Sequence, residues 1–113
     1  MSLIRDLTDD EYREACEETS DLVMVQFWAP WCGPCLAFKP VVDLIATEHA
    51  DKLKVYRINV DDNPHSAMRN NVQSIPLLVM YRSNPETGRR ERISSLGAKP
   101  KADVEEFIKP WIE

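Results

Sequence analysis

The chain has 113 residues and a net charge of −5, and 43% of its residues are hydrophobic. These values fit a soluble protein with one core, so we expect a single domain over residues 1–113. The acidic balance argues against a nucleic-acid or anionic-membrane surface, and no window is apolar enough to span a membrane. Residues 1–6 lack an apolar signal region, so we expect the protein in the reducing cytoplasm.

The first elements expected are a short strand over residues 3–7 and then a helix. Thr8, with Glu11 three residues later, forms a capping box that predicts where the helix begins. Tyr12 and Cys16 lie four residues apart and therefore share the inner face of this helix. Cys16 is expected to be a small buried hydrophobic residue rather than a redox group.

A central strand is predicted by the apolar run 22–28, which is typical of a strand covered on both faces. Its one polar residue, Gln26, needs a hydrogen-bond partner if it is buried. The next helix is expected over residues 34–49, and Pro40 should kink it, because proline cannot donate a backbone hydrogen bond.

A third strand is expected over residues 54–60, with Arg57 on one face. A short helix over 64–70 should follow, because Asn63-Pro64 combines a capping residue with a proline at the first helical position.

Pro76 heads a fourth apolar strand, expected over residues 76–81. A turn over 84–88 joins it to an edge strand over 91–96, so these two strands should form an antiparallel hairpin. The last helix has an apolar stripe of Val104, Phe107, Ile108 and Trp111. Pro110 should end the regular helix near Lys109.

The expected order is therefore β-α-β-α-β-α-β-β-α. Right-handed crossovers make the first three strands parallel, and the helices then cover both faces of the sheet. The fold class is α/β, a mixed five-stranded sheet flanked by four helices. Chemistry in such sheets lies at the carboxyl ends of central strands.

At that end of the central strand the sequence reads Trp31-Cys32-Gly33-Pro34-Cys35. Two intervening residues place both sulfur atoms on one helical turn, within reach of a disulfide. Cys32 falls at the helix N-terminus, where free N–H groups and the helix dipole favour the thiolate. We therefore expect Cys32 to be the nucleophile and Cys35 the resolving thiol.

The cysteine pair has two other possible interpretations. A structural zinc site needs four ligands, and besides the pair the chain offers only Cys16, His49 and His65, at none of the usual spacings. A purely structural disulfide would close a loop too small to constrain the unfolded chain much. Both are less favoured than a catalytic pair, and no metal is expected.

With these residues the sequence resembles the thioredoxin family over Leu3 to Ile112. The resemblance is carried by Phe27 to Cys35, which is highly specific, and by Asn59 to Pro64 and Ser74-Ile75-Pro76. It implies the thioredoxin fold and a cis Ile75–Pro76 bond, with Pro76 packed beside the cysteines.

The resemblance also implies a function: reduction of disulfides in substrate proteins through a mixed disulfide with Cys32. The Gly-Pro pair between the cysteines resembles that of the reducing members. A flavoprotein reductase would regenerate the dithiol, so NADPH and FAD would belong to that partner and no cofactor to this chain, expected to be a monomer. The implied docking surface comprises Trp31, Gly33, Pro34, Ile75, Pro76, Gly97 and Ala98, and the backbone of Ile75 would pair with a substrate strand.

The chain departs from the family at two polar positions. Gln26 stands where thioredoxins usually have a buried aspartate, and Arg57, which the neighbouring strand could bring close to it, stands where lysine is usual. Gln26 cannot titrate, so we expect slower resolution by Cys35, while the removal of a buried negative charge favours the cysteine thiolates. Alternatively, the two residues are a repacked polar pair without kinetic meaning. Leu77 stands where thioredoxins usually have threonine, and the turn near residues 84–90 is longer than usual; both differences are expected to be tolerated. The departure at Gln26 also keeps open an adaptor or chaperone-linked binding module with weak redox activity.

Overall fold

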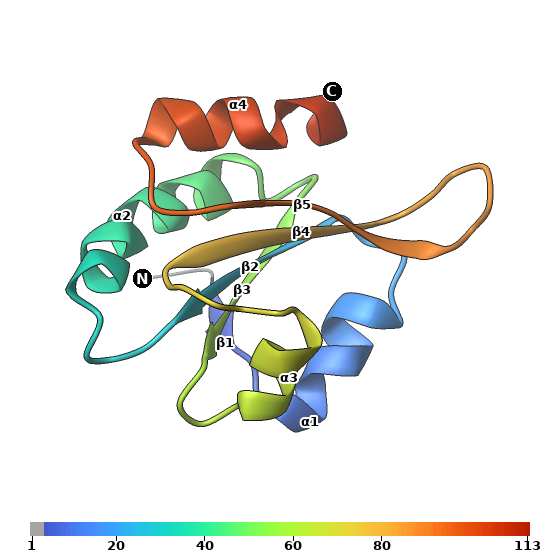
Figure 1. Cartoon of the computed structure of the whole chain (residues 1–113). Coiled ribbons are helices and arrows are strands. Elements are labelled where there is room, and N and C mark those ends of the chain that lie inside the picture. The colour runs from blue at the N-terminus through green and yellow to red at the C-terminus, as the bar shows by residue number, and fades with distance from the viewer. Residues whose placement is uncertain (1–3) are drawn as a thin grey trace.

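Five strands form one mixed sheet in the computed structural model, which describes residues 4–113 (Figure 1). They are β1 (Arg5–Asp6), β2 (Val23–Trp28), β3 (Lys54–Asn59), β4 (Leu77–Ser83) and β5 (Arg90–Leu96). Their order across the sheet is β1-β3-β2-β4-β5. β1, β3 and β2 are parallel, whereas β4 and β5 are antiparallel to their neighbours, so the predicted mixed sheet is confirmed.

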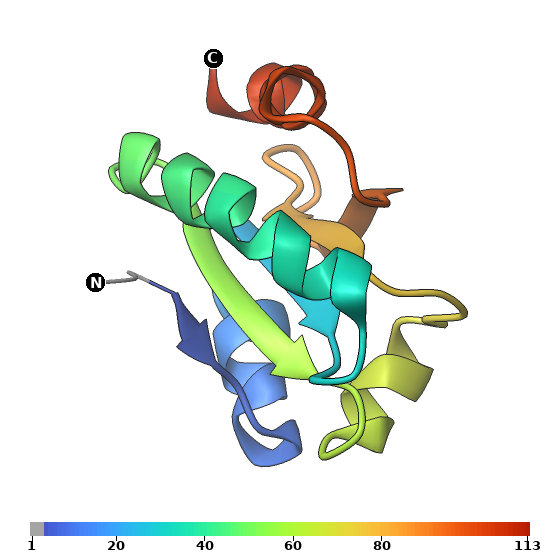
Figure 2. The same ribbon diagram turned by 90° about the vertical axis from the view of Figure 1, so that its left-hand side faces the viewer.

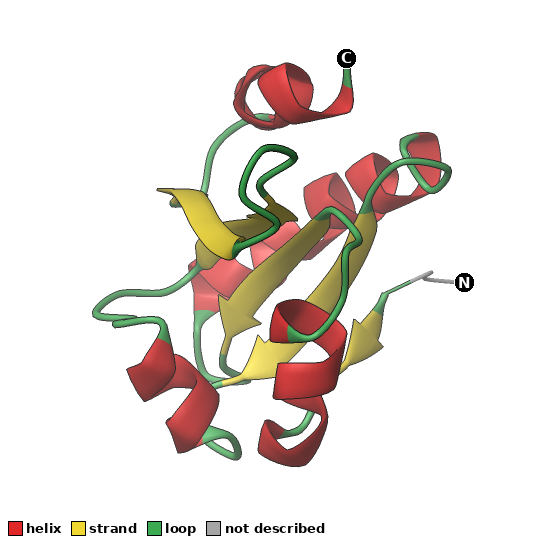
Figure 3. Cartoon of the chain, turned by 90° about the vertical axis from the view of Figure 1, so that its right-hand side faces the viewer, coloured by secondary structure: helices red, strands yellow, loops and turns green. Residues whose placement is uncertain are grey.

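The helices lie on both faces of this sheet, as the crossovers require (Figures 1 and 3). α2 (Gly33–Glu48) and α4 (Lys101–Ile112) lie on one face. α1 (Asp9–Tyr12) and α3 (Pro64–Arg69) lie on the other. Within residues 4–113, no helix is long and apolar enough to cross a membrane.

Alternation along β2 explains why the sheet is buried on both faces. Val23, Val25 and Phe27 pack in the core beneath α1 and α3. Met24 faces the other way, into the core beneath α2 and α4. Successive side chains of a strand point to opposite faces, so Gln26 lies on the same face as Met24, towards α2. This polar residue is fully buried.

The first helix is less regular than its sequence suggests. Its capping box is present, with the backbone N–H of Thr8 donating to Glu11 Oε1 at 3.0 Å. After Tyr12 the chain widens into a π-helical turn, Arg13–Glu17, closed by a 2.8 Å bond from the N–H of Glu18 to the carbonyl of Arg13. Of the strand expected before this helix, only β1 forms among the described residues; Leu3 lies outside them.

The last helix corrects the prediction for its end. We expected Pro110 to stop it near Lys109, but α4 continues to Ile112. Proline removes only its own N–H from the ladder, and Trp111 and Ile112 pack against the core beneath α2 and α4. The guanidinium of Arg82 also lies 5.0 Å from the centre of the Trp111 ring. Tertiary packing therefore outweighs the local preference.

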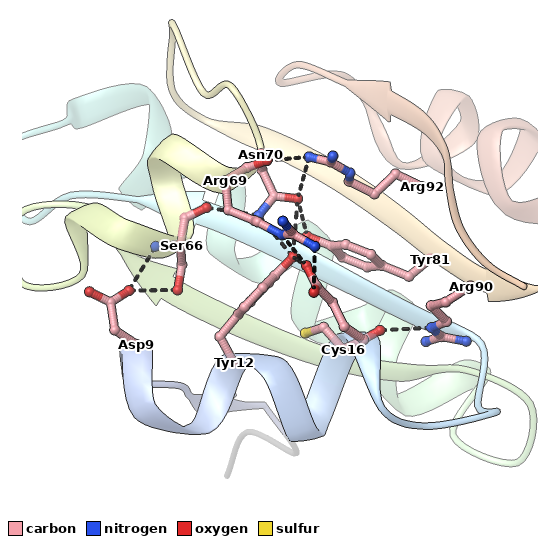
Figure 4. Close-up of polar contacts among 10 residues, drawn as sticks. Asp9, Tyr12, Cys16, Ser66, Arg69, Asn70, Tyr81, Arg90 and Arg92 are labelled. Carbon is pink, nitrogen blue, oxygen red and sulfur yellow. Dashed lines mark hydrogen bonds and ion pairs between the residues drawn. The ribbon is translucent and has the colours of Figure 1, made fainter.

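A buried polar network fixes the end of α3 (Figure 4). The hydroxyl of Tyr81 donates to Asn70 Oδ1 at 2.6 Å, and Asn70 Nδ2 donates to the Tyr12 hydroxyl at 3.1 Å. That hydroxyl in turn donates to Glu17, which is paired with Arg69. The network joins α1, α3 and β4, and so anchors the start of the segment 71–76 that leads to Pro76.

Candidate functional site

Cys32 and Cys35 lie where β2 leads into α2, at the carboxyl end of the central strand (Figure 2). The two residues are joined by a disulfide, with their Cα atoms 5.2 Å apart. Cys32 caps the helix, because its Sγ accepts a hydrogen bond from the backbone N–H of Cys35 at 3.2 Å. Its sulfur therefore lies where the N–H groups and dipole of α2 favour negative charge.

The two cysteine residues differ in exposure. Cys32 retains 5% of its surface and Cys35 none. The Sγ of Cys32 also lies 3.9 Å from the carbonyl oxygen of Ile75, on the segment between α3 and β4. Only Cys32 can be approached by another molecule without opening the structure, and Cys35 faces the protein interior.

An exposed aromatic ring stands beside the cysteines. Trp31 is 70% exposed, and its indole Nε1 donates to Asp61 Oδ2 at 2.9 Å, which fixes the ring's polar edge. Gly33 and Pro34 are exposed, and a Cβ built on Gly33 would meet no atom within 4 Å. The outer side of the helix start is therefore open.

The other side of the site is formed by two loops distant in sequence. The Ile75–Pro76 peptide bond is cis. A Cβ built on Gly97 would lie 3.9 Å from the Pro76 carbonyl, so the loop after β5 contacts the loop before β4. Ile75 is half-buried and Ala98 is exposed. Every residue expected on the docking surface thus belongs to this end of β2, the start of α2, or these two loops.

Behind the cysteines, Gln26 and Arg57 are in direct contact. They are paired in register between β2 and β3, and Arg57 Nε donates to Gln26 Oε1 at 2.8 Å. Both side chains are buried. Gln26 Nε2 points to the backbone carbonyl of Cys35 at 3.5 Å.

Sequence reasoning missed two polar residues that α2 adds to this region. Asp43 pairs with Arg57 at 3.0 Å, and Lys39 places its ammonium 3.6 Å from the centre of the Trp28 ring. A usable signal was present, since Cys35, Lys39 and Asp43 follow one another at four-residue steps and so lie along one side of the helix. Lys39 adds positive charge beside a ring that packs against the cysteine pair.

Cys16 lies apart from the site and is chemically inert. It is fully buried in the core beneath α1 and α3, whereas the cysteine pair belongs to a separate cluster. Burial raises the pKa of its thiol to about 12. Since the thiolate is the reactive form, Cys16 has no reactive population near neutral pH.

The residues considered as zinc ligands do not converge. Cys32 and Cys35 are bonded to each other, Cys16 lies in another cluster, and His65 is exposed on α3. His49 instead lies with Glu48 and Glu105 in a group free of cysteine, the one such cluster among residues 4–113 with metal-ligand spacing. Lys101 already pairs with both of these carboxylates, at 3.0 and 3.4 Å.

A C-x-x-C disulfide at the start of a helix, with only its first sulfur reachable, defines the class of thiol–disulfide exchange proteins. Within that class the chain belongs to the thioredoxin family, because the family model named Thioredoxin matches residues 3–110. Members of this family are protein-disulfide oxidoreductases.

Individual relatives agree with this assignment. The chain is 38% identical over 110 residues to the thioredoxin of Porphyra purpurea, covering 96% of this chain and 97% of that protein. It is 39% identical over 105 residues to thioredoxin 1 of Synechococcus elongatus, with 92% of each chain covered. Thioredoxin M4, chloroplastic, of Arabidopsis thaliana is 35% identical over 96% of this chain. The chain spans about half the length of that relative, 54%.

The fold has a close counterpart among solved structures. The crystal structure of the Trx4 domain of ERdj5 superposes with a TM-score of 0.91, covering all of this chain and 98% of that one. Sequence identity is 20%, so this likeness concerns the fold.

Proposed function

We propose that this chain is one thioredoxin domain that reduces disulfides in other proteins, with Cys32 as nucleophile and Cys35 as resolving thiol. The observation that carries the proposal is the disulfide between these cysteines, with Cys32 capping α2 and retaining 5% of its surface, and Cys35 fully buried. A pair with a purely structural purpose would not need one sulfur held at a helix N-terminus beside an exposed tryptophan.

The reaction has two exchange steps. The Cys32 thiolate attacks a substrate disulfide, forms a mixed disulfide and releases the first substrate thiolate. Cys35 then loses its proton and attacks Cys32 Sγ, which forms the Cys32–Cys35 disulfide and releases the second substrate thiolate. The substrate gains two electrons and the cysteine pair loses two. A partner reductase returns the electrons; by analogy with the family, that partner is a flavoprotein using NADPH and FAD.

The proton of Cys35 has no carboxylate acceptor at position 26. Gln26 can donate or accept a hydrogen bond but cannot take up a proton near neutral pH, and Arg57 stays charged. The proton therefore passes to water or to the departing thiolate. Without a negative charge at position 26, and with Arg57 and Lys39 nearby, the thiolates are favoured over the thiols. The cycle gains thiolate stability and loses speed in resolution.

Substrate proteins dock on the surface formed by Trp31, Gly33, Pro34, Ile75, Pro76, Gly97 and Ala98. Support comes from the exposed Trp31 ring, from the open space over Gly33, and from the contact between the loops carrying Pro76 and Gly97. An extended substrate segment adds to the backbone of Ile75, whose carbonyl already lies beside Cys32. The protein acts as a monomer in a reducing compartment, the cytoplasm.

Reduction of insulin disulfides with dithiothreitol tests this function, and Cys32→Ser is the control. We expect the wild-type chain to accelerate insulin precipitation and the variant to do no better than dithiothreitol alone. Equal rates for both proteins would instead favour the adaptor or chaperone-linked module that the neutral Gln26 leaves open.

A further inference from the structure

Arg57 contacts α2 at residues just before and just after Pro40, which interrupts the helix's hydrogen-bond ladder. Pro40 lies inside α2 and has no N–H, so the bond that residue 40 would donate to the carbonyl of Leu36 is absent. This weak point lies just after the turn that carries the cysteines. Arg57 Nη2 donates to the carbonyl of Lys39, the residue before the proline, at 3.1 Å. The same nitrogen pairs with Asp43, three residues after the proline, at 3.0 Å.

The same guanidinium also determines which way Gln26 points. A guanidinium has only donors, so the Gln26 atom that accepts from Arg57 Nε must be the amide oxygen. The NH2 group of Gln26 then faces α2, where it lies 3.5 Å from the carbonyl of Cys35. A buried amide could otherwise adopt either orientation.

Asp43 in turn orients Arg57. The arginine side chain is buried, whereas the Asp43 side chain is 39% exposed and brings a negative charge to the rim of the network. A buried guanidinium needs both a counter-charge and acceptors for its fixed fork of donors. Asp43, the Lys39 carbonyl and Gln26 supply these together.

We infer that Arg57 and Asp43 are positioning residues of the redox centre. They attach the turn of α2 that contains Pro40 to β3, and they aim the Gln26 amide at the carbonyl of Cys35. Their effect falls on the second exchange step, in which Cys35 Sγ must approach Cys32 Sγ in line with the bond that breaks. This inference rests on the proposed exchange reaction. It attributes the positioning of Gln26 and α2 to the shape of the guanidinium group rather than to its charge.

The test follows the reaction of the reduced protein with 5,5′-dithiobis-(2-nitrobenzoate). Cys32 attacks the reagent and releases one thionitrobenzoate; Cys35 then resolves the mixed disulfide, releasing a second thionitrobenzoate and a proton. Arg57→Lys keeps the charge but loses the fork, and we expect it to slow the second release roughly tenfold, equivalent to about 1.4 kcal/mol. The first release should change by less than about twofold, since the helix N-terminus is unchanged.

Asp43→Asn provides an independent variant at a half-exposed position, where the side chain keeps its size and loses its charge. It should slow the second release in wild-type protein and have no further effect in an Arg57→Met background, because the two residues act through one another. Asp51→Asn, an exposed aspartate outside the network, is the matched control and should leave both phases unchanged.

Two results would overturn the inference. In one, Arg57→Lys resolves as fast as wild type, so that the charge alone suffices. In the other, the variants lower the urea midpoint while the second release keeps its rate, so that the network is structural only. Failure of the proposed function would show differently, as absent insulin reduction by the wild-type chain.

Discussion

Gln26 accepts a 2.8 Å hydrogen bond from Arg57 in the space behind the cysteine pair. Because glutamine is neutral at every accessible pH, the resolving thiol has a polar neighbour without a proton acceptor. Placing a carboxylate at this position therefore tests the chemistry of the second exchange step.

Gln26→Asp should resolve a mixed disulfide faster than wild type, by roughly tenfold or more, because general bases contribute factors of about a hundred or more elsewhere. The new charge should also make the cysteine thiols titrate at higher pH and the reduction potential more negative, since it disfavours both thiolates. Gln26→Asn serves as the control, because asparagine has the same length as aspartate but carries no charge. Equal resolution rates for the two variants, with equal thiol titrations, would contradict a role for proton transfer.

Two thiols of the reduced protein, Cys32 and Cys16, should differ in reactivity. Cys32 should be modified by a thiol reagent at neutral pH, whereas Cys16 should react only after unfolding, because it is fully buried and burial raises the pKa of its thiol to about 12. Counting labels by mass spectrometry with and without guanidinium chloride checks this. Cys16→Ala should leave insulin reduction unchanged. Labelling of Cys16 in the folded protein at a rate comparable to Cys32 would be the contrary result.

Stability should fall in alkaline solution. Burial raises the pKa of Cys16 and of Tyr12 to about 12, and raises that of Tyr81 further. The folded state therefore keeps protons that the unfolded chain releases from about pH 9 upward, so the stabilisation is complete below that pH and is lost towards pH 12. For Cys16 the loss is about 1.4 kcal/mol per pH unit.

Urea unfolding between pH 8 and pH 12 measures this loss of stability. The pH range follows from the ordinary pKa values of a thiol and a phenol, about 8.5 and 10. The Cys16→Ala variant should lose less stability across the range than wild type, although it begins lower because a buried sulfur is missing. Parallel curves for the two proteins would show that the buried thiol does not contribute.

Asp9 should stabilise the contact between α1 and α3. Its carboxylate accepts bonds from the hydroxyl and N–H of Ser66, at 2.6 and 2.8 Å, and from the N–H of His65 at 3.2 Å. Burial alone would raise the pKa of Asp9, but these hydrogen bonds outweigh it and hold the pKa below its ordinary value. The stabilisation is thus present above about pH 4 and is lost as pH falls through the lowered value.

Asp9→Ala should therefore lower the free energy of unfolding at pH 7 by about 1–2 kcal/mol, the usual loss when a helix cap is removed. The exposed neighbour Asp10 offers the matched control, Asp10→Ala, which should change stability by less than about 0.5 kcal/mol. Chemical denaturation of both variants at pH 7 and pH 3 distinguishes them. Equal losses for the two would contradict the capping role.

Much of the fold was predictable because the strongest sequence signals agree with one another. The apolar run at β2, the capping box at Thr8, the Asn63-Pro64 pair and the stripe on α4 each predict an element that forms close to its expected place, although the Asn63 side chain makes no capping hydrogen bond to α3. The fold depends on these patterns together, and local propensity and tertiary packing point the same way. The predicted end of α4 was wrong because it was based only on the local effect of Pro110, whereas the packing of Trp111 against the core decides where the helix ends.

The site was predictable in part, for a similar reason. The two cysteines of the motif Cys32-Gly33-Pro34-Cys35 lie within one helical turn, so their disulfide can be predicted without knowing any tertiary contact. The pairing of Gln26 with Arg57 follows from strand register, which parallel strands made plausible. The four-residue spacing places Asp43 on the side of α2 that carries Cys35, but its ion pair with Arg57 also depends on how α2 crosses the sheet, which no local pattern specifies.

Capture of the mixed disulfide tests the central claim most directly. A Cys35→Ser variant, incubated with an excess of a disulfide-containing protein, should accumulate one covalent adduct, because the attacking sulfur remains and the resolving one is gone. Peptide mapping should place the bond on Cys32, and the Cys32→Ser variant should form no adduct at neutral pH. An adduct through Cys35 or Cys16, or none from the Cys35→Ser variant, would contradict the account.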